Sequence, residues 1–131
     1  MFVKTDGEEF AFTTADGLRL VGMVHRSSTE ASQAPLVLIH GHAGSAQDFD
    51  DHVKWLSSGR DVYTYWQRGH GMSDSPRNLA SYSLQIFTDD LLGLLRSRDI
   101  TTPDVIAHSM GGVVAQLALI QSSESFGRVI L

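Results

Sequence analysis

Near the start of the chain, apolar and polar residues alternate on both sides of a short turn. The segments 8–14 and 18–25 flank the tripeptide Ala-Asp-Gly, and Asp-Gly between alternating segments is a strong hairpin signal. Because side chains alternate between the faces of a strand, Leu20 and Gly22 are expected on one face and Val21 on the other. The pattern predicts an antiparallel hairpin at the start of the fold.

After the hairpin, short apolar runs alternate with segments of helical periodicity. Residues 36–39 form a continuous apolar run, which is typical of a strand buried on both faces of a parallel sheet. Ser45 and Asp48 are spaced as a capping box at the start of a helix. Further strands are predicted at 61–65, 105–107 and 128–131, and further helices at 83–98 and 110–121. This order predicts an α/β fold: a predominantly parallel sheet with right-handed crossovers, helices on both faces and an initial antiparallel hairpin.

Composition restricts the class of protein further. With 131 residues, 42% of them apolar and 19% charged, the chain is long enough for one domain with its own core. The net charge of −5 and the scattered Lys and Arg residues argue against a nucleic-acid partner. No apolar run is long enough to span a membrane and no signal peptide is visible, so a cytoplasmic location is expected. The absence of cysteine excludes disulfides, thiolate metal sites and cysteine nucleophiles.

The most informative motif is Ala-His-Ser-Met-Gly at 107–111, where a strand is predicted to end and a helix to begin at once. This is the pattern of a nucleophile elbow, in which a strained turn holds Ser109 clear of the sheet. The turn needs small neighbours, here Ala107 and Gly111, and Gly112 extends the clearance into the helix. Ser109 is therefore the candidate nucleophile, unless its hydroxyl merely caps the helix by bonding a free amide.

Two backbone amides are candidates for an oxyanion hole beside Ser109. Met110 follows the serine at the start of a helix, where backbone N–H groups favour developing negative charge. His42 lies in the sequence His-Gly-His-Ala-Gly directly after the strand 36–39, at the strand end where parallel sheets bind ligands. His40 and His42 are also spaced as a His-x-His metal pair, but a loop-ordering role for His40 through backbone hydrogen bonds is favoured over metal ligation.

A third motif, Gln-Arg-Gly-His-Gly at 67–71, also follows a predicted strand. The three motifs, in this order and spacing, resemble the α/β-hydrolase superfamily, in the branch with a serine nucleophile. The resemblance runs from the hairpin to Leu131 and covers the N-terminal half of the family's domain. It implies Ser109 as nucleophile, the His42 and Met110 amides as oxyanion donors, and esterase, lipase, lactonase or related acyl chemistry without a metal or cofactor.

The chain departs from the family pattern at two positions near these motifs. Ala107 replaces the first glycine of the elbow, and it is small enough for the turn. Trp66 stands where similar sequences commonly carry an aspartate. Packing in the core is favoured for the Trp66 side chain, although Trp66 and His108 are also candidates to line a substrate pocket.

A third departure concerns the catalytic base. In the family the triad runs in the order Ser, Asp or Glu, and then His, but all six histidines of this chain precede Ser109. A hydroxyl without a base is a weak nucleophile at neutral pH. We therefore expect residues 1–131 to be the N-terminal part of a catalytic domain whose cap and C-terminal part are absent, with the acid and base supplied by a second chain or copy. The isolated chain is expected to keep at best a residual rate.

These observations predict a serine hydrolase that cleaves an ester-like small molecule through an acyl-enzyme. Two alternatives stay open from the sequence. One keeps the fold but cleaves a carbon–carbon bond or acts as a cofactor-free oxygenase. The other is a non-catalytic protein that binds a ligand or a partner, because a fold by itself does not determine function.

Overall fold

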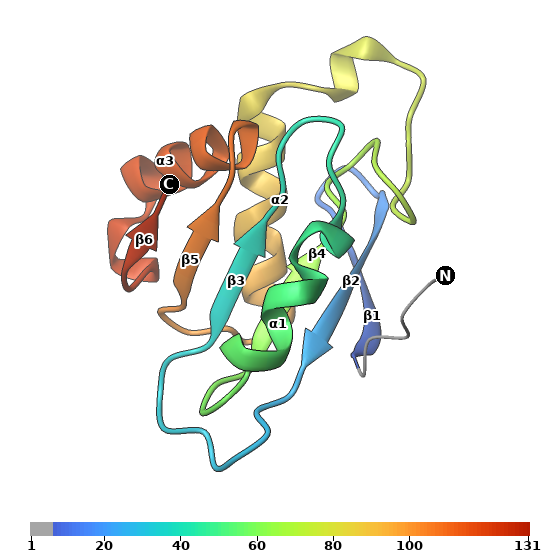
Figure 1. Cartoon of the computed structure of the whole chain (residues 1–131). Helices are drawn as coiled ribbons and strands as arrows, with labels where there is room; N and C mark the ends of the chain where they lie inside the picture. The colour runs from blue at the N-terminus through green and yellow to red at the C-terminus, as the bar shows by residue number, and fades with distance from the viewer. Residues whose placement is uncertain (1–6) are drawn as a thin grey trace.

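The computed structural model describes residues 7–131 as one mixed sheet with helices against both of its faces (Figure 1). The six strands lie in the order β1-β2-β4-β3-β5-β6. They are β1 (Glu8–Thr13), β2 (Arg19–His25), β3 (Leu36–Ile39), β4 (Val62–Tyr65), β5 (Asp104–Ala107) and β6 (Val129–Ile130). The helices are α1 (Asp50–Leu56), α2 (Leu84–Ser97) and α3 (Met110–Gln121), with short 3₁₀ turns η1 (Ala46–Phe49), η2 (Leu79–Ser81) and η3 (Ser123–Ser125). Within these residues no helix has the length and apolar character needed to cross a membrane.

The predicted hairpin is present. β1 and β2 pair antiparallel in a register that sets Thr13 opposite Arg19. The turn between them closes through a hydrogen bond from the Gly17 N–H to the Thr14 carbonyl oxygen (3.0 Å), and Gly17 has a φ of +86° that favours glycine. β2 also pairs antiparallel with β4, whereas β4, β3, β5 and β6 run parallel to one another. The hairpin therefore extends a parallel sheet at one side.

β3 illustrates how a central strand is buried on both faces. Val37 and Ile39 pack in the cluster that contains α2 and α3 side chains, whereas Leu36 and Leu38 pack with side chains of α1. In Figure 1, α1 lies in front of the sheet and α2 and α3 lie behind it. The prediction of a predominantly parallel sheet with helices on both faces is confirmed.

The helices begin and end close to the predicted residues. Ser83 caps α2 by accepting a hydrogen bond from the Ile86 N–H, and α3 spans the predicted range. Ser45 and Asp48 form the predicted capping box. The structure differs from the prediction in the element that follows this cap, which is the 3₁₀ turn η1, and the helix α1 begins only at Asp50.

An ion-pair network around a buried arginine holds the loop after β4 in place. The Arg68 side chain is fully buried. It donates to the carboxylates of Asp90 on α2 and Asp16 in the hairpin turn, and to the Ser81 carbonyl oxygen, at 2.6–2.9 Å. Burial alone would lower the pKa of Arg68, but these hydrogen bonds outweigh burial and raise the pKa above its usual range. The network joins three segments far apart in the chain, and nothing in the hydrophobic pattern predicts it.

Candidate active site

Ser109 joins β5 to α3 at a strained point of the backbone. Its φ of +54° and ψ of −120° are rare for a residue with a side chain. The residue is exposed, and in the described part of the chain its hydroxyl makes no capping hydrogen bond to the helix. The capping interpretation of Ser109 is therefore wrong, and the backbone has the strained strand-to-helix turn of a nucleophile elbow.

The close approach of α3 to the end of β3 determines which small residues the turn needs. A Cβ atom at Gly111 would lie 2.6 Å from the carbonyl oxygen of His40 and 2.7 Å from that of Ile39. A Cβ atom at Gly112 would meet nothing nearer than 3.8 Å, which is an ordinary contact. Backbone packing therefore requires glycine at 111, whereas the expectation that Gly112 provides clearance is wrong.

A tight turn after β3 lies against Ser109. It spans residues 41–44 and closes through a hydrogen bond from its last N–H to its first carbonyl oxygen (3.0 Å). A Cβ atom on Gly41 would lie 3.2 Å from the Cβ of Ser109 and 3.1 Å from Nδ1 of His108. The absence of a side chain at Gly41 thus lets the turn, which carries His42, contact the candidate nucleophile.

Several backbone amides in this turn and at the start of α3 are already hydrogen-bonded. The Ala43 N–H donates to Nε2 of His70, and the Gly111 N–H donates to a backbone carbonyl oxygen. Within residues 7–131, the amides of His42 and Met110 have no acceptor. The two amides expected to form an oxyanion hole are thus among the unbonded amides of the two segments that meet at the serine, and an oxyanion needs free donors of this kind.

His40, which lies between β3 and the turn, is buried. Its Nε2 accepts a hydrogen bond from the Gln67 N–H (3.0 Å), so its Nδ1 carries the proton and donates to the Gly41 carbonyl oxygen (2.7 Å). Burial lowers the pKa of His40 below its usual 6.5. Both ring nitrogens therefore order the loops after β3 and β4, as expected. Across the described residues, no three His, Cys, Asp or Glu side chains cluster as metal ligands.

The two candidate pocket residues lie in different surroundings. Trp66 is buried against Val21 and Ala46 and donates from Nε1 to the Ser45 hydroxyl oxygen (3.1 Å). The favoured interpretation of Trp66 as a packed core residue is confirmed, and its ring also forms one wall of a hollow of about 240 Å³. His108 is exposed at the elbow. Contact of either residue with a substrate stays a prediction.

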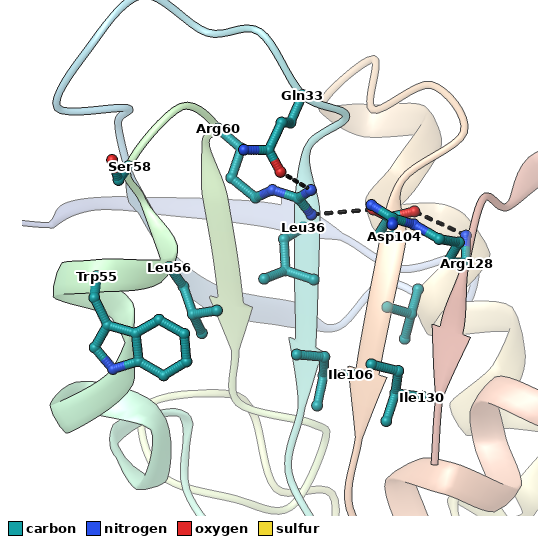
Figure 2. Close-up of a pocket in the computed structure, with 11 residues that line it drawn as sticks. Gln33, Leu36, Trp55, Leu56, Ser58, Arg60, Asp104, Ile106, Arg128 and Ile130 are labelled. Carbon is teal, nitrogen blue, oxygen red and sulfur yellow. Dashed lines mark hydrogen bonds and ion pairs between the residues drawn. The ribbon is translucent and has the colours of Figure 1, made fainter.

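The hollow in Figure 2 lies at the opposite end of the strands from Ser109. It has a volume of about 410 Å³, and residues from the amino ends of β3 and β5 line it, among them Leu36 and Asp104. Asp104 accepts hydrogen bonds from Arg60 (3.1 Å) and Arg128 (2.9 Å) at one end of the hollow. Because β5 begins at Asp104 and Ser109 follows its other end, this hollow is not part of the candidate active site.

One contact at the turn was not foreseen from the sequence. His70, in the Arg-Gly-His-Gly motif after β4, accepts the hydrogen bond of the Ala43 N–H (3.0 Å), and its ring centroid lies 4.8 Å from that of His40. The motif was a signal that this loop matters. Its partner could not be identified, because the contact joins two loops 27 residues apart.

Comparisons with known proteins identify the family of this chain. A family model described as serine aminopeptidase, S33, matches residues 30–131. The AB hydrolase superfamily protein YfhM of Bacillus subtilis is 31% identical over 112 residues, which are 84% of this chain and 38% of that protein. The sn-1-specific diacylglycerol lipase ABHD11 of Mus musculus is 32% identical over 104 residues, which are 78% of this chain and 33% of that lipase.

The comparison of solved structures gives the same superfamily. An α/β hydrolase from Novosphingobium aromaticivorans superposes with a TM-score of 0.88 at 25% sequence identity, over 97% of this chain and 44% of that structure. The chain thus spans less than half the length of these three relatives. Because the family model covers more than half of the chain, the protein belongs to the serine aminopeptidase family that this model describes, within the α/β-hydrolase superfamily.

Proposed function

We propose that this chain is the N-terminal, nucleophile-bearing part of a serine hydrolase, which cleaves a carboxylic ester or related acyl bond through an acyl-enzyme. The observation that carries the proposal is the backbone of Ser109, whose φ is positive although its hydroxyl makes no capping hydrogen bond to α3. A capping role for Ser109 therefore does not explain the backbone strain, and strained residues of this kind cluster at active sites. Membership of the family supports the same conclusion.

In the proposed reaction, Oγ of Ser109 attacks the carbonyl carbon of the substrate while its proton passes to a base. The carbonyl oxygen gains negative charge, which the His42 and Met110 N–H groups bind with the help of the N-terminus of α3. The leaving alcohol or amine departs with a proton, and water then cleaves the acyl-enzyme to release the acid. Loss of one oxyanion donor typically slows such a reaction by about 10²–10³-fold.

The catalytic acid and base are proposed to come from outside these residues. His40 and His70, which border the turn beside Ser109, use both ring nitrogens on backbone groups and are not free to act as the base. A serine hydroxyl needs a base to react at neutral pH. The relatives are more than twice as long as the segments matched in them, and a second chain or copy that supplies the missing groups is part of the proposal.

Exposed apolar side chains support such a partner. Trp55, Ile130 and Leu131 are 63%, 63% and 61% exposed, and Trp55 and Ile130 line the hollow of Figure 2. In the described sheet β6 pairs only with β5, so its outer edge can accept another strand. We propose that the partner packs on this hollow and this edge, because a contiguous exposed apolar patch marks an interaction surface.

Hydrolysis of esters and amides tests the proposal. Protein purified with any copurifying chain is assayed with p-nitrophenyl acetate, p-nitrophenyl octanoate and an amino-acid p-nitroanilide, because the comparisons name a lipase and an aminopeptidase. We expect faster ester than amide cleavage, and a loss of about 10³-fold or more in Ser109→Ala. Ser97→Ala, which changes an exposed serine at the end of α2, should keep the full rate. Equal rates in the wild type and Ser109→Ala would contradict the proposal.

A further inference from the structure

His70 connects the loop after β4 to the turn after β3 through both of its ring nitrogens. Nε2 accepts a hydrogen bond from the Ala43 N–H (3.0 Å), and Nδ1 donates to the Arg68 carbonyl oxygen (3.0 Å). An amide N–H can only donate, so Nε2 carries no proton and the ring is the neutral tautomer protonated at Nδ1. The Arg68 side chain is fully buried in its ion-pair network, which fixes the loop from which His70 reaches the turn.

This hydrogen bond acts on the strained residue of the turn. Ala43 is the third of the four residues 41–44 and has a φ of +58°, a conformation that glycine or asparagine usually occupies. The commonest β-turn, type I, has a negative φ at its third residue, whereas a type II turn has a positive φ there. The two turn types differ mainly by a flip of the central peptide group. Here the central group is the His42–Ala43 peptide, whose N–H donates to His70. Without that acceptor the flip would relieve the strain, so His70 selects the conformation that the turn adopts.

The same turn carries the candidate oxyanion donor. The His42 amide has no acceptor within the described residues, and a Cβ atom on Gly41 would lie only 3.2 Å from the Cβ of Ser109. The rings of His40 and His42 lie beside His70, with centroids 4.8 Å and 6.0 Å away. The His42 N–H belongs to the preceding Gly41–His42 peptide, so a flip of the His42–Ala43 peptide acts on it through the backbone torsion angles of His42, which the two peptides share.

We propose that His70 is a positioning residue of the candidate active site. It holds the turn 41–44 in the conformation that presents the His42 amide to the oxyanion, and it does so without touching Ser109 or the substrate. The inference rests on the proposed function, because it assigns His70 to oxyanion stabilisation. A displacement of about 1 Å in such a group can slow a reaction by about 10²-fold, so a residue one contact away has a measurable effect.

Four variants separate the hydrogen bond from the packing of the ring. His70→Phe keeps an aromatic ring beside His40 and His42 but removes the acceptor. His70→Gln keeps a side-chain oxygen that can accept from the Ala43 amide. Ala43→Gly, added to His70→Phe, lets the backbone adopt a positive φ without strain. His52→Phe changes an exposed histidine of α1 and serves as the control.

The first readout is hydrogen exchange of the Ala43 amide, measured by NMR. We expect exchange to become about tenfold faster in His70→Phe, the change expected for loss of one hydrogen bond. His70→Gln and His52→Phe should keep the wild-type rate, and the Leu38 amide in β3 reports any change in overall stability. Unchanged exchange of the Ala43 amide in His70→Phe would overturn the inference.

The second readout is the second-order rate constant for labelling of Ser109 by a fluorophosphonate, measured on protein with any copurifying chain. We expect His70→Phe to slow labelling by about 10–100-fold. His70→Gln should stay close to the wild-type rate, and the double variant with Ala43→Gly should recover part of the loss. Equal labelling of the wild type and His70→Phe, with faster Ala43 exchange, would overturn the positioning role and leave the proposed function intact. Absence of Ser109 labelling in the wild type would overturn the proposed function and the inference with it.

Discussion

At the residue scale, the candidate site depends on strain in two residues and on the absence of side chains in two others. Ser109 and Ala43 both hold a positive φ despite their side chains, and they lie in the two segments that meet at the site. Gly41 and Gly111 let these segments approach to distances that a Cβ atom would not allow. The elbow motif predicted that Gly111 and Gly112 must be small and made no such prediction for Gly41. Only the packing of α3 on β3 shows that glycine is needed at 111 and not at 112.

Alanine at Gly111 is expected to destabilise the protein, whereas alanine at Gly112 is not. At Gly111 the new Cβ would lie 2.6 Å from the His40 carbonyl oxygen, and overpacking of this kind costs about 1–3 kcal/mol. At Gly112 the contacts are ordinary, and alanine in a helix is about 0.5–1 kcal/mol more favourable than glycine. Urea unfolding of both variants measures the difference, and a Gly111→Ala variant as stable as Gly112→Ala would contradict the packing of α3 on β3.

At the scale of secondary structure, the hydrophobic pattern predicts the elements well and the contacts between their loops poorly. Caps and periodicity are local signals, so Ser83 at the start of α2 and the full length of α3 were predictable. The Arg68 pairs with Asp16 and Asp90 span 52 and 22 residues, and their formation depends on how the sheet brings distant loops together. The same holds for His70: the sequence shows its motif, but its hydrogen bond to the Ala43 N–H joins two loops and could not be predicted from local signals.

At the scale of the whole molecule, the two ends of the sheet have different properties. Ala43 and Ser109, which have a positive φ, and the unbonded amides of His42 and Met110 lie after the carboxyl ends of β3 and β5. Exposed apolar side chains, including Trp55 and Ile130, lie at the hollow toward the amino ends. Ligands of parallel sheets bind at the carboxyl ends, so a partner that packs on the hollow must also extend along the β6 edge to bring its catalytic base to Ser109.

Global stability is expected to fall as the pH drops below the usual histidine pKa of 6.5. Burial lowers the pKa of His40 and of His25, so below 6.5 the unfolded chain binds more protons than the folded chain, until the lowered values are passed. Each histidine then reduces the free energy of unfolding by up to about 1.4 kcal/mol per pH unit. Urea unfolding at about pH 7.5 and about pH 5.5 measures this loss.

Two variants assign the pH effect to burial. His40→Gln should lose less stability on acidification than the wild type, because it removes one of the two buried histidines from the titration. His52→Gln, which changes an exposed residue of α1, should show the full loss. An identical loss in the wild type and His40→Gln would mean that His40 does not contribute.

The most direct test of the central claim is covalent labelling of Ser109. Protein purified with any copurifying chain is treated with a fluorophosphonate. Intact-mass spectrometry counts the adducts, and peptide mass spectrometry identifies the modified residue. We predict a single adduct on Ser109, absent from Ser109→Ala and retained in Gly112→Ala, because Ser109 has a strained backbone and adjoins the segments that carry the unbonded His42 and Met110 amides. An unmodified Ser109 in the wild type, or the same adduct in Ser109→Ala, would contradict the claim that this serine is a nucleophile.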